Sequence, residues 1–213
     1  LHSARGSRAV GAGRRLVAPY PPAGRRTVQV KALVCSVFLA ALVAGAVTMA
    51  GVQLPDDWTV DGQRLVLNGA GTREHGPLGI DLYAAALYLP AREREGRAGL
   101  LLGGPGLRVV HLHLLRNADR DTSVLSWEVC LAENCAGQCA LPAVARQRFL
   151  ALIPETRRGD TQTLILRPGS VQFNRNGKPL GTVNGAALGS AVLACWLGKA
   201  PVDADLKKDL LRR

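Results

Sequence analysis

Arg73 is the side chain in this sequence that is best equipped, by its type and its neighbours, to bind a ligand. It ends a glycine-rich segment, Gly69-Ala70-Gly71-Thr72-Arg73, which predicts a turn, and a strand is expected over residues 79–89. Residues 84–89 are apolar on both alternating faces, so this strand should be buried on both sides. Three consecutive alanines leave space there, which either a helix or a ligand fills. A guanidinium fork pairs a carboxylate through two hydrogen bonds, so Arg73 is a candidate anion anchor; the alternative is a surface arginine at a sheet edge.

Other groupings that could do chemistry are weaker. His111 and His113 share one face of an expected strand and, with His75, offer nitrogen ligands for a metal ion. The simpler interpretation, which we favour, is that His111 and His113 lie on the solvent-facing side of that strand. The sequence contains no nucleophile elbow, no phosphate-binding loop and no paired catalytic carboxylates. We therefore expect neither a metal ion nor a cofactor.

The spacing of apolar and turn residues predicts a mixed fold. Asp61-Gly62 between two short apolar runs indicates a hairpin, and Asp119 and Pro142 suit the starts of helices. Strands and helices occur in separate runs, which is typical of an α+β fold with a mostly antiparallel sheet. The expected strands are residues 58–60, 64–67, 79–89, 107–115, 161–166, 170–173 and 179–183, and the last two expected helices are residues 184–198 and 203–211.

The net charge of +11 suggests nucleic-acid binding, but the distribution of the charge along the chain argues against it. Residues 1–50 carry seven of the 27 basic residues and no acid, which leaves 20 basic and 16 acidic residues in the remainder. That remainder has an ordinary mixed surface and no platform of aromatic and basic residues. We expect no nucleic-acid partner.

Residues 30–50 are expected to form a signal peptide. Lys31 precedes an apolar run over residues 32–47, which is shorter than the roughly 20 residues of a membrane span. Small residues at 44–46 and 48–50 offer cleavage sites, so residues 51–213 should be one exported domain, periplasmic or secreted, with no membrane span. Val30 is interpreted as the start, and residues 1–29 as translated leader DNA; the alternative is a disordered arm with an internal anchor.

The exported part keeps four cysteines, an even number for an oxidising compartment. Three pairings are possible. Cys135 and Cys139 lie close enough to bridge where two helices meet, which would leave Cys130 and Cys195. A zinc site is disfavoured because Cys195 has no near partner in sequence.

Three segments together resemble the chalcone isomerase family, in particular its bacterial chalcone isomerase-like proteins. The first is the Gly69-Ala70-Gly71-x-Arg73 turn with the strand that ends in Tyr88-Leu89. The second is the late hairpin at residues 173–181, and the third is the closing helix at residues 188–199. The ordered match spans roughly residues 54–211. It implies an open-faced β-sandwich, in which a large, mostly antiparallel sheet is backed by helices on one face.

The resemblance also implies where a ligand would lie. In the enzymes of the family an arginine holds the substrate oxygen, and Arg73 falls on it. Tyr83 falls on the strand threonine, Asp121-Thr122 on a tyrosine, Val129 on an asparagine and Cys195 on a Ser/Thr, so only the arginine is retained. The candidate ligand-binding residues are Arg73, Tyr83, Tyr88, Thr122 and Cys195.

The missing proton relay argues against the family's ring-closing reaction, which needs a stabilised oxyanion and a positioned proton path. Non-catalytic members of the fold bind fatty acids. We therefore expect a non-catalytic binder of a small amphipathic carboxylate such as a fatty acid. The alternative is an isomerase, an intramolecular lyase acting on a phenolic or unsaturated carbonyl compound through a rebuilt site. A purely structural or partner-binding role is a third possibility.

Overall fold

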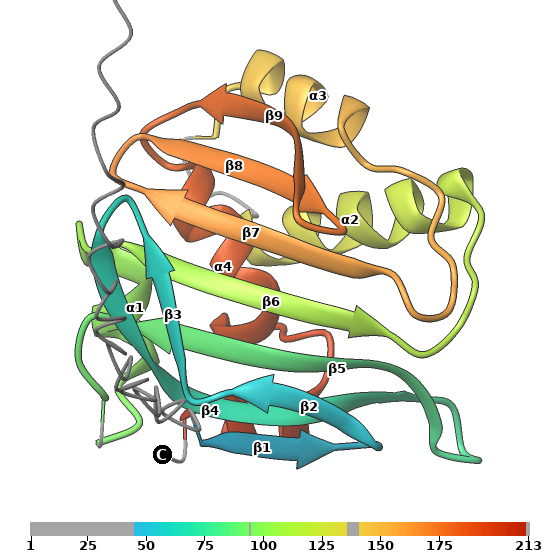
Figure 1. The fold of residues 1–213 in the computed structure, drawn as a ribbon. Helices are drawn as coiled ribbons and strands as arrows, with labels where there is room; N and C mark the ends of the chain where they lie inside the picture. The colour runs from blue at the N-terminus through green and yellow to red at the C-terminus, as the bar shows by residue number, and fades with distance from the viewer. Residues whose placement is uncertain (1–44, 94, 136–140, 212–213) are drawn as a thin grey trace, which may run out of the picture. The chain divides into compact units, whose positions relative to one another are not determined.

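Seven strands form one antiparallel sheet in which each strand pairs with its neighbour in sequence (Figure 1). The computed structural model describes residues 45–93, 95–135 and 141–211, all within one compact unit. The sheet order is β3 (Asp57–Val60), β4 (Gln63–His75), β5 (Ile80–Leu89), β6 (Arg108–Leu114), β7 (Thr161–Arg167), β8 (Ser170–Arg175) and β9 (Lys178–Asn184).

Helices cover one face of this sheet, as Figure 1 shows. They are α1 (Ala98–Gly103), α2 (Arg120–Cys135), α3 (Ala143–Ala151), α4 (Leu188–Leu197) and α5 (Ala204–Leu211). A two-stranded sheet, β1 (Ala46–Met49) and β2 (Val52–Pro55), pairs separately. The α+β class and the antiparallel sheet backed by helices are confirmed. None of the helices within the described ranges is long and apolar enough to cross a bilayer.

The strand β5 separates two hydrophobic cores, as its two apolar faces predict. Ala85 and Leu87 belong to the core between the sheet and the helices, whereas Ala84, Ala86 and Tyr88 belong to a second core with residues of β2, β3 and β4. The three alanines are fully buried. Their small side chains let both layers approach this strand closely.

The segment 69–71 is not the turn that its glycines predict, because it lies inside β4. A Cβ on Gly69 would lie 2.6 Å from the backbone carbonyl carbon of Leu210, and one on Gly71 would lie 2.8 Å from the Cβ of Asp209. The glycines therefore let α5 pack directly on the strand. The actual turn follows at residues 76–79, where Gly76 and Gly79 have positive φ angles of 72° and 58°.

The predicted boundary at residue 51 falls inside this fold. Strand β1 pairs with β2, and its Val47 and Met49 pack against the second core. A product that starts at Gly51 would lack β1, whereas one that starts at Val47 would keep most of it. The signal-peptide prediction itself remains a prediction, since residues 30–44 lie outside the described residues.

Candidate ligand-binding site

A cavity of about 340 Å³ lies between the helix-facing side of the sheet and helices α2 and α4. Its floor comes from β4, β5, β6 and β7, and its roof from α2, α4 and Val202. Much of the lining is apolar and comes from Leu82, Leu112, Leu114, Trp127, Ile153, Trp196 and Val202. Pockets of this volume and character are typical of sites for small molecules.

Arg73 and Tyr83 form the polar end of the cavity. They are directly opposed in the β4–β5 register, and the guanidinium carbon lies 5.6 Å from the centroid of the tyrosine ring. The Nε atom of Arg73 is buried, and none of the described residues accepts a hydrogen bond from it. A buried donor without a partner is costly. Because Arg73 lines the cavity, an anionic group there is a candidate partner for its guanidinium.

The Tyr83 hydroxyl is a second donor at this end. The indole Nε1–H of Trp196 donates to it over 3.0 Å. Because an indole nitrogen can only donate, the tyrosine oxygen is the acceptor in this contact, and its own proton remains available. Burial raises the pKa of Tyr83, and the charge of Arg73 only partly offsets this effect. The hydroxyl is thus protonated at neutral pH.

A disulfide holds the roof together. Cys130 of α2 is bonded to Cys195 of α4, and both residues line the cavity. This is one of the pairings that the sequence left open. Cys135 is disulfide-bonded as well, and Cys139 lies outside the described residues. Next to the bridge, the rings of Trp127 and Trp196 pack edge to face with centroids 5.6 Å apart, so the roof is well packed.

The first turn of α2 forms the rim beside Thr122. Asp119 caps the helix, because its carboxylate accepts hydrogen bonds from the Thr122 backbone N–H (2.7 Å) and from the Thr122 hydroxyl (2.8 Å). The backbone contact, followed by the hydroxyl contact, lowers the pKa of Asp119. Since its proton is given to Asp119, the Thr122 hydroxyl can serve a ligand as an acceptor.

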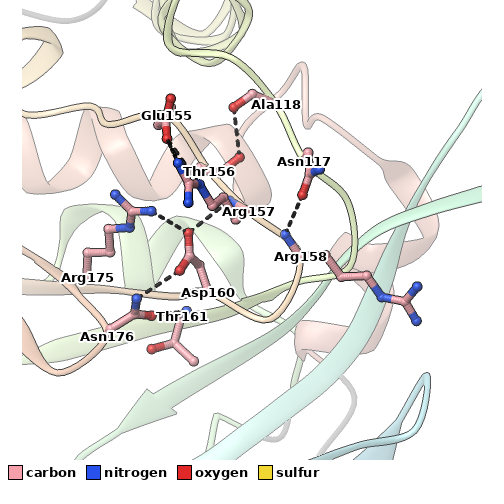
Figure 2. A network of polar contacts seen from close by, with 10 residues as sticks. All are labelled: Asn117, Ala118, Glu155, Thr156, Arg157, Arg158, Asp160, Thr161, Arg175 and Asn176. Atoms are coloured by element: carbon pink, nitrogen blue, oxygen red, sulfur yellow. Dashed lines mark hydrogen bonds and ion pairs between the residues drawn. The ribbon is translucent and has the colours of Figure 1, made fainter.

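A polar network fixes the loops at the same rim (Figure 2). Ala118 and Thr156 exchange two backbone hydrogen bonds of 3.0 and 2.8 Å, and both residues line the cavity. Asp160 accepts from Arg175 (2.7 Å), Asn176 (2.8 Å) and the Arg157 backbone N–H (2.8 Å). Burial disfavours its charge, but these contacts outweigh burial and lower the pKa of Asp160.

The structure brings four of the five predicted residues to one cavity. Arg73, Tyr83, Thr122 and Cys195 line it, and Tyr88 does not. The side chain of Tyr88 is fully buried on the opposite face of β5, where its hydroxyl donates to the carbonyl of Pro55 over 2.9 Å. Side chains alternate along a strand, so residues five apart, such as Tyr83 and Tyr88, point to opposite faces.

The three histidines considered as metal ligands, His75, His111 and His113, do not form one cluster. His111 is buried and not solvent-facing as expected: its ring lies 4.7 Å from that of Trp58, and its Nδ1 lies 2.9 Å from the Thr163 hydroxyl. Burial, and to a lesser degree the charge of His113, lowers the pKa of His111 to about 4. His75 lines the cavity on the other side of the sheet. Among the described residues, no three His, Cys, Asp or Glu side chains are grouped to hold a metal ion.

Six polar lining residues were not predicted from the sequence: Arg116, Asn117, Ser123, Ser126, Thr156 and Gln162. Arg116 follows β6 at the mouth, where its Nε lies 3.4 Å from the carbonyl of Asp81. Gln162 lies on β7 and is 95% buried. The alternation of the expected strand at 161–166 carried a signal for Gln162, because it shares a face with Leu164 and Leu166.

Comparisons with known proteins agree with this architecture. Residues 46–212 match the family model described as chalcone isomerase-like. Among solved structures, the fold is similar to that of a fatty-acid binding protein from Arabidopsis thaliana, with a TM-score of 0.64 and 18% sequence identity. That alignment covers 79% of this chain and 96% of the other. No curated protein matches the chain.

Proposed function

The chain belongs to the chalcone isomerase-like family, and on that premise we propose that it is a non-catalytic binder of a small amphipathic carboxylate such as a fatty acid. The carboxylate would lie at the polar end of the cavity, against Arg73 and Tyr83. The hydrocarbon chain would lie against the apolar lining. The similar Arabidopsis protein is a fatty-acid binding protein, which supports this ligand class.

The observation that carries the proposal is the pair of available donors at one end of an otherwise mainly apolar cavity. Arg73 and Tyr83 both line the cavity: the first contributes its guanidinium, and the second contributes a hydroxyl proton. A carboxylate has two oxygens and can accept both. Hydrogen bonds to a charged group in a site shielded from water are among the stronger ones.

Cys195 and Thr122 occupy positions where the family's enzymes have proton-transferring or substrate-positioning residues, and their contacts support a binding role over catalysis. The sulfur of Cys195 is part of a disulfide, so it carries no thiol proton to transfer. The Thr122 hydroxyl donates to Asp119. Within the described lining, no arrangement of acid and base is evident that would move a proton along a conjugate-addition path.

We also propose that the protein is exported. The apolar run after Lys31 and the small residues at 44–46 and 48–50 support this. The disulfide between Cys130 and Cys195 suits an oxidising compartment.

The test is titration of the purified full-length chain with a fluorescent fatty acid, together with native mass spectrometry of protein as purified. Saturable binding to one site is expected, with negligible ring closure on chalcones in a parallel assay. Ring closure well above the uncatalysed rate that is lost in Tyr83→Phe would instead support an intramolecular lyase.

A further inference from the structure

Gln162 is a polar residue on a surface that is otherwise apolar. The next residues on the same side of β7 are Leu164 and Leu166, both fully buried in the core beneath the helices. Gln162 is 5% exposed and lines the cavity. A leucine at this position would continue the apolar surface. The presence of a polar amide here therefore calls for an explanation.

The amide of Gln162 has no hydrogen-bond partner within the part of the chain that the structure describes. Its cross-strand neighbour on β8 is Arg175, but the guanidinium of Arg175 forms a 2.7 Å ion pair with Asp160. The atoms of this amide are not among the fully buried side-chain atoms that lack a partner, so they remain accessible from the cavity. Because the residue lines the cavity, a group inside the cavity can provide the missing partner.

Gln162 and Arg73 lie at opposite ends of the cavity. Arg73 is on β4 and Gln162 on β7, so three inter-strand steps separate them, about 14 Å across the sheet at the usual strand spacing. Leu112 and Leu114 of β6 line the cavity between them. A ligand that reaches both ends would lie across the strands with its apolar middle over these leucines.

We propose that the ligand carries a second, uncharged oxygen function at the end remote from its carboxylate, and that Gln162 binds it. This rests on the proposed function, in which Arg73 holds the carboxylate. The second group should be neutral, because the charge of the nearby Arg175 is balanced by its ion pair with Asp160, although the Nε–H of Arg175 is itself unpaired among the described residues. A primary amide both donates and accepts, which matches a hydroxyl. The ligand class is then a hydroxylated fatty acid, with the hydroxyl near the end of its chain.

The experiment compares straight-chain saturated fatty acids with the ω-hydroxy acid of each length, titrated into the full-length chain and into Gln162→Leu. At the matching length, the parent should bind the hydroxy acid about tenfold more tightly than the plain acid, the upper range for a neutral hydrogen bond in a dry site. Gln162→Leu should reverse the preference, because it removes the partner of the hydroxyl and favours a methyl end. Gln162→Met, which keeps the length of the side chain, gives the same comparison if the leucine variant folds poorly.

Gln172→Leu is the matched control. Gln172 is also a strand glutamine, but its amide contacts Asn174 and Arg167, and it does not line the cavity. This variant should keep the preference of the parent. Equal binding of both acids by the parent, with no change in Gln162→Leu, would refute this inference alone. Binding of neither acid would refute the proposed function as well.

Discussion

Trp196 of α4 donates a hydrogen bond to the hydroxyl of Tyr83 on β5, with 3.0 Å between indole nitrogen and phenol oxygen. The contact links the roof of the cavity to its floor. It also fixes the direction in which the tyrosine proton points, because the oxygen already accepts from the indole.

Tyr83→Phe should weaken fatty-acid binding by about 2- to 10-fold, since one hydrogen bond to the carboxylate is lost. It should also lower the free energy of unfolding by about 1–3 kcal/mol, because the Trp196 N–H is left buried and unpaired. Tyr88→Phe is the control. It likewise removes a buried hydroxyl, one that donates to Pro55 on the other face of the sheet. It should destabilise the fold and leave the dissociation constant unchanged; weaker binding in both variants would assign the effect to stability.

Arg73→Ala should weaken fatty-acid binding about 10- to 100-fold, as expected for a hydrogen bond to a charged group worth about 1.5–3 kcal/mol. Arg73→Lys should recover only part of the loss, because an ammonium lacks the two-donor fork. The measurement is a titration of a fluorescent fatty acid at one salt concentration. Arg64→Ala, at an exposed arginine of the same strand that pairs with Asp57, should bind like the parent. If Arg73→Ala also bound like the parent, Arg73 would be removed from the site.

The stability of the fold should fall as the pH drops from about 6.5 to about 4, because His111 has a folded-state pKa lowered to about 4. In this window the unfolded chain binds a proton that the folded protein excludes, so stability is lost as the pH falls. The loss should approach about 3 kcal/mol at the acidic end, since one pKa unit is worth about 1.4 kcal/mol. Urea unfolding of the parent and of His111→Gln across this range is the measurement. An equally steep loss in the variant would show that another group is responsible.

Removal of the Cys130–Cys195 bridge by Cys130→Ser with Cys195→Ser should lower the free energy of unfolding by about 2–4 kcal/mol. Fatty-acid affinity should fall too, because the bridge holds α2 to α4 over the cavity. Urea unfolding and ligand titration report the two effects. Thiol titration of the denatured, non-reduced parent from an oxidising compartment should detect neither cysteine. Two reactive thiols at these positions would contradict the bridge.

The exported protein should begin between Val47 and Gly51, as the small residues at 44–46 and 48–50 predict. N-terminal sequencing of secreted material is the direct measurement. A start at Leu1 or Val30 would refute export by cleavage. Of the allowed starts, those near Val47 preserve the pairing of β1 with β2 and should give the more stable product.

Local patterns predicted most of the sheet, because they depend on neighbours in sequence. The Asp61-Gly62 turn sets the β3–β4 hairpin, where both residues have positive φ, and the two apolar faces of β5 predict its position between two hydrophobic cores. The errors came from distant contacts. The glycines at 69 and 71 predict a turn, yet they let α5, near the far end of the chain, pack on β4. His111 is covered by Trp58 of β3.

The contrast between local patterns and distant contacts also holds for the candidate ligand-binding site. The family resemblance located Arg73, Tyr83, Thr122 and Cys195, which all line the cavity. Tyr88 does not line it, because strand alternation places this residue on the other face from Tyr83. The cap at Asp119 was visible in the sequence. The hydrogen bond from Trp196 to Tyr83 was not, because it joins residues 113 apart in the chain.

The strand order also has a consequence for folding. Since every strand of the large sheet pairs with its neighbour in sequence, most pairings close short loops, and short loops cost little entropy. The cavity instead needs α2 and α4 together, and the two cysteines that join them are 65 residues apart. β6 and β7 are the exception, because residues 115–160, which include α2 and α3, lie between them. We therefore expect β3–β6 and β7–β9 each to pair before the cavity exists, so that a bound ligand slows unfolding and leaves the folding rate nearly unchanged.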